Sequence, residues 1–271
     1  MAIDLAKSHN VSLSDNNIES LNKIKSKDNS ISIYQLDVQD KIALQEWIKP
    51  ADIVLLAVPG FLGYNALETI IEAGKNVVDI SFSPENVLEL NNLAKQKSVI
   101  AIVDAGVAPG IPNYLLGYYN TKMDINVFEY CVGGLPKNPT PPFYYKAPFS
   151  PIDVIEEYTR PARMMVDGEI VTKPALSEIE TITFEECGEL EAFNTDGLRS
   201  ILSTMNHIPN MKEKTLRYPK HANLMKDYKE KGLFSAENIK DTSEKLFKEW
   251  QLKENEEELT IMDIVIEGKE N

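Results

Sequence analysis

Five short runs of β-branched and apolar residues recur at nearly even spacing in the first part of the chain, and they constrain the fold more than any other feature. The runs begin at Val11, Ile31, Ile53, Val77 and Val99, so successive starts lie 20, 22, 24 and 22 residues apart. Apolar residues at helical spacing fill the intervals. Strands that alternate with helices in this way pair in parallel, with helices on both faces of the sheet. The sequence therefore predicts a doubly wound α/β sheet.

The composition is that of a globular protein with no nucleic-acid or membrane partner. Of the 271 residues, 43% are hydrophobic and 26% are charged, which suffices for a sizeable core. The formal net charge of −14 would repel a phosphate backbone. No apolar run approaches the ~20 residues of a membrane span, and the first residues lack the basic and apolar regions of a signal peptide. We therefore expect a cytoplasmic location.

Cysteine and histidine are too few and too scattered for a disulfide framework or a metal site. The two cysteines, Cys131 and Cys187, have no metal-ligand spacing, and the three histidines form no zinc motif. We expect reduced thiols and no bound metal.

An acid follows the first of the five strands. In a dinucleotide-binding sheet the second strand usually ends in an acid that binds the adenosine ribose hydroxyls. Asp15 ends the run at residues 11–15, and Asn16 and Asn17 follow it. A carboxylate there accepts hydrogen bonds from a 2′-hydroxyl and repels a 2′-phosphate, so it favours NAD over NADP. Capping of the next helix would explain Asp15 equally well, but the regular alternation of strands and helices favours the ligand role.

The glycine-rich loop that should precede this acid falls before the start of the sequence. The loop lies about 20 residues upstream of the acid, and no glycine occurs before Gly60. Residues 2–9 match the tail of the first helix. We therefore expect the first strand and its Gly-x-Gly-x-x-Gly turn to be missing. The strands that would flank it, residues 11–15 and 53–58, then either pair directly or leave the domain loose.

Eight further stretches, in a fixed order, resemble one family. They read AVPGFLG (57–63), VDISF (78–82), DAGVAPGIPN (104–113), GGLP (133–136), YYKAPFSP (144–151), YTRPAR (158–163), EAFNTDGLR (191–199) and KTLRYP (214–219). This succession resembles the saccharopine dehydrogenase-like reductases over roughly residues 2–267, and within them it is similar to the lysine 6-dehydrogenases. No single stretch is specific, but eight in order make chance agreement remote.

The resemblance implies a Rossmann domain, then an inserted α+β domain with a mixed sheet, after which the chain returns to the first domain. The expected fold class is α/β, an incomplete Rossmann-type doubly wound parallel sheet with an inserted catalytic and dimerisation domain. We place the NAD-binding domain at residues 1–113 and the substrate and dimerisation domain at 114–271, in a homodimer. Family members continue past the position of Ile266, so the C-terminal return is also expected to be cut.

The resemblance also implies an NAD-dependent oxidoreductase acting on the CH–NH group of an amino acid. We favour oxidative deamination of L-lysine at the 6-position, because many saccharopine reductases carry an Asp where this chain has Ala108, and the difference favours a smaller amine. A saccharopine- or carboxynorspermidine-type reductase stays open. So does an inactive remnant that serves as a binding or dimerisation module.

The ends of several strands are candidates for cofactor contact. Small residues let backbone approach the nicotinamide ring and its ribose, and Pro-Gly turns follow two strands of the predicted sheet, although such turns can also simply reverse the chain. Asp37 could meet the adenine amino group or cap a helix. Asp79 and Ser81 follow the fourth strand of this chain and face the same cleft. The candidates for NAD contact are thus Asp15, Asp37, Val58, Pro59, Asp79, Ser81, Gly106, Ala108 and Pro109.

An amino-acid substrate needs a cation for its carboxylate. A planar guanidinium binds a carboxylate through two hydrogen bonds, which a lysine cannot imitate. The marked candidates are Arg160, Arg163, Arg199 and Arg217. For any one of them a structural ion pair is the simpler explanation, but the resemblance favours Arg199 and Arg217 as substrate anchors.

Hydrolysis of the imine formed by amine oxidation needs a base. Lys146, next to Tyr145, could have its pKa lowered by desolvation, or it could cover an aromatic surface with its aliphatic stem. His221, which follows Arg217 closely in sequence, titrates near neutrality and is the rival base. We count Lys146, Tyr145, His221 and the two arginines as the catalytic candidates.

Overall fold

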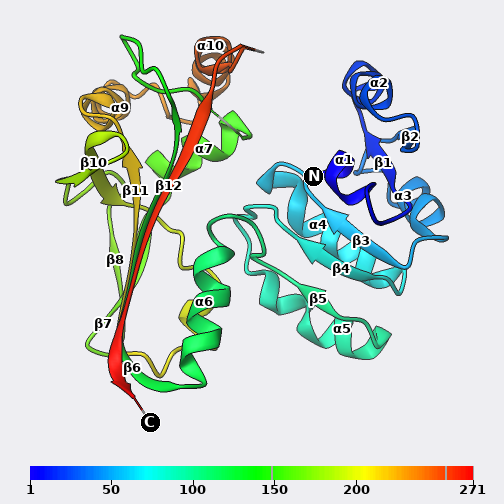
Figure 1. Cartoon of the computed structure of the whole chain (residues 1–271), viewed down its shortest axis with the longest axis horizontal. Helices are drawn as coiled ribbons and strands as arrows, with labels where there is room; N and C mark the ends of the chain where they lie inside the picture. The colour runs from blue at the N-terminus through cyan, green and yellow to red at the C-terminus, as the bar shows by residue number, and fades with distance from the viewer. Residues whose placement is uncertain (148, 254, 271) are drawn as a thin grey trace. The chain divides into compact units, whose positions relative to one another are not determined.

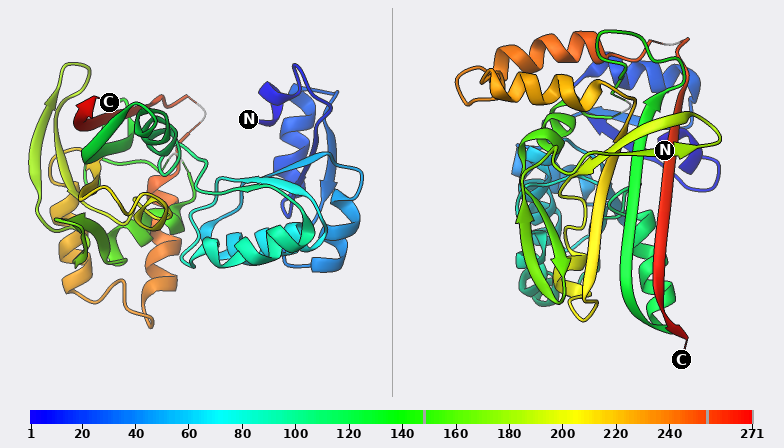
Figure 2. Two further views of the ribbon diagram at one scale, coloured as in Figure 1. Left: turned by 90° about the horizontal axis from the view of Figure 1, so that it is seen from below. Right: turned by 90° about the vertical axis from the view of Figure 1, so that its left-hand side faces the viewer.

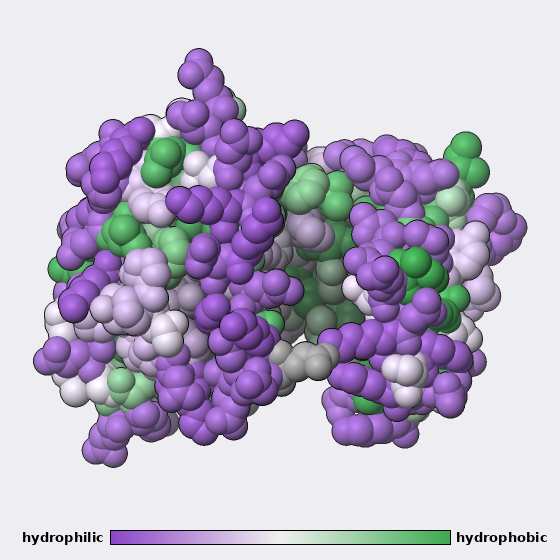
Figure 3. Space-filling view, turned by 90° about the horizontal axis from the view of Figure 1, so that it is seen from above, coloured by the Kyte–Doolittle hydropathy of each residue, from purple (hydrophilic) through white to green (hydrophobic). Residues whose placement is uncertain are grey.

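The computed structural model describes residues 1–147, 149–253 and 255–270, and it divides the chain into two compact units, Met1–Val103 and Asp104–Asn271 (Figure 1). The expected domain boundary at 113/114 falls inside the second unit. Pro148, in the YYKAPFSP motif, lies outside the described residues. In the described part of the chain no helix is long and apolar enough to cross a membrane. The face shown in Figure 3 is predominantly hydrophilic, in keeping with the net charge of −14.

Unit 1 alternates strands with helices, as the spacing of its apolar runs predicts. Polar caps start two of the helices, because the side chain of Asn17 accepts hydrogen bonds from Glu19 and Ser20, and that of Asp40 from Ala43. The elements are α1 (Ala2–Leu5), β1 (Ser12–Asp15), α2 (Ile18–Lys27), β2 (Ser32–Gln35), α3 (Lys41–Ile48), β3 (Ile53–Leu56), α4 (Gly60–Glu72), β4 (Asn76–Asp79), the 3₁₀ helix η1 (Val87–Leu90), α5 (Asn91–Lys97) and β5 (Ala101–Ile102).

The core of unit 1 forms around α4. Leu67, Ile70 and Ile71 lie on one face of this helix and are almost wholly buried. They belong to the same apolar cluster as Ile48 of α3 and Leu56 of β3. The helical spacing of these residues therefore fixes how α4 covers the sheet.

The parallel strands of unit 1 form two separate sheets among the residues described. β1 pairs with β2, while β4 pairs with both β3 and β5. In the usual dinucleotide-fold order 3-2-1-4-5-6, β2 and β1 occupy positions 3 and 2, and β3 begins at position 4. The break thus falls where the first strand of that order would lie. The strands that flank this position, β1 and β3, were expected either to pair directly or to leave the domain loose. In the described residues they do not pair with each other.

Unit 2 is built on one mixed sheet, which confirms the predicted α+β architecture. Its strands follow the order β12-β6-β11-β10-β9, with β7 pairing with β11 and β8. β11 and β6 are parallel, and the other pairs are antiparallel. The elements are α6 (Ile111–Asn120), β6 (Met123–Pro136), α7 (Pro151–Thr159), β7 (Ala162–Val166), β8 (Glu169–Lys173), β9 (Glu180–Phe184), β10 (Gly188–Asn194), α8 (Ile201–Thr204), β11 (Asn210–Arg217), α9 (His221–Glu230), α10 (Ile239–Trp250) and β12 (Glu258–Glu270).

The last strand of the described chain stays within unit 2. β12 pairs with β6 from Glu258 opposite Pro136 to Glu270 opposite Met123, and the two long strands lie side by side in Figure 2. This segment therefore forms an edge strand of the mixed sheet of unit 2.

Three helices close one end of the unit 2 sheet. α7, α9 and α10 bury Tyr158, Met225 and Trp250 in a single apolar cluster, which also holds Phe193 of β10. This cluster encloses several of the polar residues that the sequence marks as catalytic candidates.

Candidate functional site

Two acids are predicted to contact the adenosine end of NAD: Asp15 is the last residue of β1, Asp37 follows β2, and both are exposed. Asp15 Oδ1 accepts a hydrogen bond from the backbone N–H of Asn17 at 2.8 Å, and Asp37 Oδ1 accepts one from Gln39 at 2.9 Å. Neither acid is the N-cap of the helix that follows, which is Asn17 for α2 and Asp40 for α3. Simple helix capping therefore does not account for either residue.

Val58 and Pro59 form the turn between β3 and α4. Pro59 is the N-cap of α4, which begins at Gly60. Val58 is half-buried and packs against the core of unit 1. The turn is compact, as the Pro-Gly sequence predicts, and it leaves the N–H groups of the first helical turn at the carboxyl end of the strand.

Asp79 and Ser81 are buried rather than displayed at the strand end. Asp79 Oδ1 accepts hydrogen bonds from the backbone N–H of Ser81 at 2.8 Å and from its hydroxyl at 2.6 Å. A Cβ at Gly63 would lie 2.3 Å from the Ser81 hydroxyl and 2.2 Å from that of Ser83. Gly63 is therefore needed for α4 to pack against this loop, which gives Asp79 and Ser81 a structural role in the described chain.

The loop after β5 belongs to unit 2 and is tightly folded. Gly106 and Gly110 form an isolated bridge, and a Cβ at Gly110, where φ is +152°, would lie 1.8 Å from the Gly106 carbonyl oxygen. Ala108 packs against the apolar cluster of β6 and α8, and Pro109 joins it to Gly110. The side chain of Asp104 accepts a hydrogen bond from the backbone N–H of Ser200 at 2.9 Å. The predicted cofactor contacts Gly106, Ala108 and Pro109 thus share a rigid turn that Asp104 anchors within unit 2.

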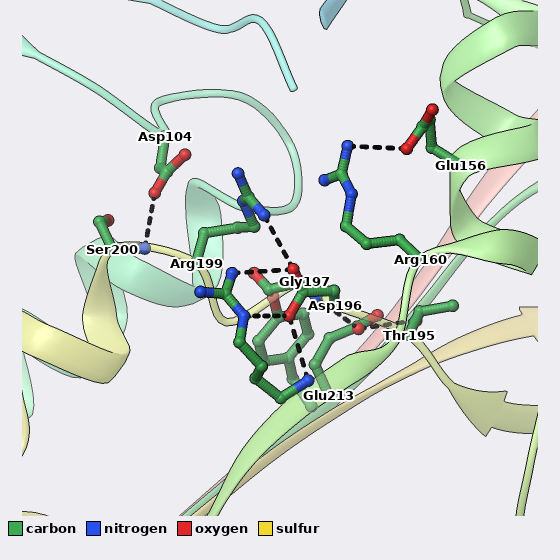
Figure 4. Close-up of polar contacts among 11 residues, drawn as sticks. Asp104, Glu156, Arg160, Thr195, Asp196, Gly197, Arg199, Ser200 and Glu213 are labelled. Carbon is green, nitrogen blue, oxygen red and sulfur yellow. Dashed lines mark hydrogen bonds and ion pairs between the residues drawn. The ribbon is translucent and has the colours of Figure 1, made fainter. Parts of the chain in front are cut away.

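Two arginines bind Asp196, which follows β10, and a third lies near one of them. The buried Asp196 carboxylate accepts hydrogen bonds from Arg163 Nε and Nη2 at 2.9 and 2.8 Å and from Arg199 Nη1 at 2.8 Å. Arg160 is paired with Glu156 at 3.1 Å, and Figure 4 shows its guanidinium pointing toward that of Arg199. We call Asp196, Arg160, Arg163 and Arg199 the arginine cluster.

Electrostatics and backbone geometry single out Arg199 in this cluster. Its side chain is 7% exposed, and burial, followed by the nearby positive charge of Arg160, lowers its pKa. By contrast, the hydrogen bonds to Asp196 raise the pKa of Arg163. Arg199 also has a φ of +47°, a conformation uncommon for a residue with a side chain. An anion beside Arg199 and Arg160 would relieve the repulsion between the two guanidinium groups.

Arg217 has a different environment from Arg199. It is 2% exposed and forms an ion pair with Glu157. Its Nε donates to the Tyr158 hydroxyl at 3.2 Å, and its guanidinium carbon lies 4.4 Å from the centre of the Tyr145 ring. Because Glu157 and the two tyrosines surround Arg217, this geometry argues against its prediction as a substrate anchor.

His221 lies in the same buried cluster. One ring nitrogen is 2.8 Å from the Tyr158 hydroxyl, and the other is 2.7 Å from the carbonyl oxygen of Phe143. Burial, with the positive charge of Arg217, lowers the pKa of His221 to about 3. A neutral, enclosed imidazole suits a structural role better than that of a base for attacking water.

Lys146 does not share the aromatic environment that its neighbours in sequence suggested. Its Nζ donates to the carbonyl oxygen of Glu249 at 2.9 Å and to that of Gln251 at 3.4 Å. These contacts hold the Lys146 side chain at the C-terminal end of α10. Tyr145 itself is buried against Arg217 and His221.

The structure thus brings Arg199 together with Arg160 and Arg163, whereas Arg217 pairs with Glu157. Two residues that organise the arginine cluster, Asp196 and Glu213, are not among the candidates that the sequence predicts. Asp196 stands inside the marked stretch EAFNTDGLR and could have been singled out as an acid among arginines. Glu213 has no such signal, because only the pairing of distant strands places it there. Among the described residues no group of three or more His, Cys, Asp or Glu side chains could hold a metal ion.

Comparison with known proteins agrees with this architecture. The family profile of the saccharopine dehydrogenase NADP binding domain matches residues 1–102, and that of the saccharopine dehydrogenase C-terminal domain matches residues 106–271. The alpha-aminoadipic semialdehyde synthase of Arabidopsis thaliana is 25% identical over 148 residues, which are 52% of this chain and 14% of the relative. The mitochondrial enzyme of the same name from Mus musculus is 24% identical over 208 residues, 72% of this chain and 22% of the relative.

A solved structure shows the same fold. The apo form of saccharopine dehydrogenase (L-Glu forming) from Saccharomyces cerevisiae matches with a TM-score of 0.66 at 21% identity, over 86% of this chain and 56% of that one. The chain therefore spans a minor part of the two curated relatives and about half of this solved structure. With profiles that cover both units, the chain belongs to the saccharopine dehydrogenase family.

Proposed function

We propose that this chain contains the substrate-binding part of an NAD-dependent oxidoreductase that acts on the CH–NH group of an amino acid. The proposed substrate is L-lysine. In that reaction NAD would accept a hydride from the ε-carbon, and the imine would hydrolyse to a semialdehyde and ammonia. The arginine cluster is the observation that carries the proposal, because it offers guanidinium groups at a fixed position in a chain of this family.

Arg199 is the proposed anchor for the substrate carboxylate. Asp196 holds one of its nitrogens at 2.8 Å, which fixes the plane of the guanidinium. A planar guanidinium can bind two carboxylate oxygens at once. Arg160 adds a second positive charge nearby, so a carboxylate bound by Arg199 would lie in a favourable field.

The described residues suit the adenosine and nicotinamide ends of a dinucleotide better than its diphosphate. Asp15 and Asp37 are exposed acids at strand ends, as the adenosine end requires, and the turn at Val58 and Pro59 suits the nicotinamide end. The diphosphate normally lies on a glycine-framed helix N-terminus after the first strand. No glycine occurs before Gly60, so these residues provide no such turn between β1 and β3.

The choice of NAD over NADP rests on Asp15, whose exposed carboxylate would repel a 2′-phosphate. L-lysine is preferred because Ala108 stands where many saccharopine reductases carry an Asp. A saccharopine-type reaction is the second candidate, since the relatives reported above are named for saccharopine and aminoadipic semialdehyde chemistry. Assembly as a homodimer through unit 2 is part of the same proposal.

The test uses a chain lengthened at its N-terminus by a grafted β-strand and a Gly-x-Gly-x-x-Gly turn, assayed for reduction of NAD and of NADP with L-lysine and with saccharopine. We expect NAD reduction with L-lysine, and Asp15→Ala should narrow the preference for NAD, whereas Asp52→Ala, an exposed control, should not. Faster turnover of saccharopine would establish the second candidate. Binding of neither amino acid by any form of the chain would contradict the proposal.

A further inference from the structure

Glu213 is a buried acid beneath the turn that carries Asp196 and Arg199. It lies in β11 and is 3% exposed. Its Oε2 accepts a hydrogen bond from the Thr195 hydroxyl at 2.7 Å and another from the backbone N–H of Gly197 at 3.0 Å. Figure 4 shows Glu213 reaching the two residues on either side of Asp196.

The turn fits closely onto this carboxyl group. A Cβ at Gly197 would lie 2.6 Å from Cδ and 2.7 Å from Cγ of Glu213, so any other residue there would require the Glu213 side chain or the turn to shift. The Tyr130 hydroxyl donates to the Gly197 carbonyl oxygen at 2.8 Å, and the hydroxyl groups of Thr195 and Thr215 lie 2.8 Å apart. Asp196 is therefore fixed from both neighbours in sequence, by groups that belong to β6 and β11.

We propose that Glu213 is a positioning residue of the carboxylate site: it holds Thr195 and Gly197 so that Asp196 keeps the guanidinium groups of Arg163 and Arg199 in place. The effect of Glu213 on substrate binding rests on the proposed function. Its effect on the position of Asp196 rests on contacts within unit 2. Glu213 acts through Asp196, because its own hydrogen bonds are to Thr195 and Gly197 of the turn.

The protonation of Glu213 suits this role. Burial, followed by the negative charges of Glu157 and Asp196, raises its pKa to about 8, although the hydrogen bonds from Thr195 and Gly197 act in the opposite sense. A neutral carboxyl group accepts both hydrogen bonds without placing a second negative charge beside Asp196. Glutamine, with one carbonyl oxygen and no charge, should therefore replace Glu213 well.

The experiment compares Glu213→Gln and Glu213→Met with a control, Glu129→Gln. Glu129 is on β6 and lies opposite Lys212 of β11, the residue that precedes Glu213. Its side chain is 36% exposed. Two quantities are measured on the 271-residue chain: the proton–nitrogen NMR signal of Arg163 Nε, which reports its hydrogen bond to Asp196, and the affinity for L-lysine by calorimetry. Thr195→Val serves as a second variant if Glu213→Met fails to fold, because it removes the hydrogen bonds of the Thr195 hydroxyl to Glu213 and Thr215 and leaves Glu213 in place.

We expect Glu213→Met or Thr195→Val to move or broaden the Arg163 signal and to weaken L-lysine binding by about tenfold, the effect of one hydrogen bond of ordinary strength. Glu213→Gln and the control should leave both quantities within about twofold. An unchanged Arg163 signal in folded Glu213→Met overturns the inference. If the signal moves as expected but the unsubstituted chain binds no L-lysine, the positioning of Asp196 is supported and the proposed function fails instead.

Discussion

Both units contain parallel strand pairs, but the sheet of unit 1 is interrupted where that of unit 2 is continuous. In the described chain β1 and β3 each have one partner, whereas β6 pairs with β12 on one side and β11 on the other. Ile53 and Leu55 of β3 are 60% and 40% exposed, while Phe128 and Tyr130 of β6 are buried. Regular strand–helix units thus form unit 1 without joining its strands into one sheet. In unit 2, pairing between distant segments makes the sheet continuous.

The two arginines favoured by the sequence extend this comparison within unit 2. Arg217 is enclosed by Glu157 and two tyrosines, and Arg199 shares Asp196 with Arg163 beside Arg160. The first arrangement compensates its charge internally. The second places Arg163 and Arg199 on one buried carboxylate, with Arg160, itself paired with Glu156, close to Arg199.

The largest expected difference is in hydrogen exchange. Amides of β6 and β11 should exchange more slowly than those of β1 and β3 by a factor of about a thousand, because strands with a single partner open at low free-energy cost. β4 is the internal control, since it has a partner on both sides within unit 1 and should exceed β3 in protection. Equal protection of β3 and β6 would mean that the break in the unit 1 sheet has no energetic consequence.

The next largest effect is expected at Arg217. Arg217→Met should lower the free energy of unfolding of unit 2 by ~3–5 kcal/mol, because it leaves the Glu157 carboxylate, whose side chain is only 16% exposed, without its partner. Denaturant unfolding measures this loss. The double variant Arg217→Met/Glu157→Leu should recover part of it, and Arg199→Met should cost less because Arg163 still binds Asp196. Equal losses at Arg217 and Arg199 would contradict the distinction drawn between the two arginines.

Substrate affinity should show the opposite ranking. Arg199→Lys removes the planar guanidinium and should weaken L-lysine binding by ~1–3 kcal/mol. Calorimetry on this variant and on Lys212→Gln, a half-buried control whose ion pair is with Glu129, gives the comparison. Unchanged affinity in Arg199→Lys would place the substrate carboxylate elsewhere in the molecule.

A smaller effect is expected in the dependence of stability on pH. Burial raises the pKa of Glu213 from 4.5 to about 8, so the folded state binds the extra proton and stability falls as pH rises through this window. The pKa of His221 is lowered from 6.5 to about 3, so stability is lost as pH falls below 6.5. Each slope is at most ~1.4 kcal/mol per pH unit. Glu213→Gln should flatten the decline above pH 6.5 in urea unfolding; an unaltered slope there would show that Glu213 is ionised in the native state at neutral pH.

Much of unit 1 could be predicted from the sequence because its information is local. The spacing from Val11 to Val99 predicts the five strands, and the helical spacing of Leu67 and Ile70 predicts which face of α4 is buried. In unit 2 the sequence predicted a mixed sheet through family resemblance, but not that β12 would pair along β6. Such a pairing joins segments more than a hundred residues apart and leaves no periodic signal.

The candidate site could likewise be predicted only where the information is local in the sequence. Arg199 was recognised as a candidate from a motif rich in hydrogen-bonding residues, and the structure places it beside Arg160 and Arg163. His221 and Lys146 were chosen because their side chains can titrate. Their environments, a buried aromatic cluster for His221 and two backbone carbonyls for Lys146, depend on the packing of α9 and α10 and could not be read from neighbouring residues.

The most direct test of this account is a calorimetric titration of the 271-residue chain with NAD. The described residues between β1 and β3 contain no glycine-framed helix N-terminus for the diphosphate, so we expect no saturable binding up to ~1 mM cofactor, which corresponds to an affinity of less than about 4 kcal/mol. Binding with a Kd on the order of 1 μM, or about 8 kcal/mol, would contradict it. It would show that another part of the chain holds the diphosphate.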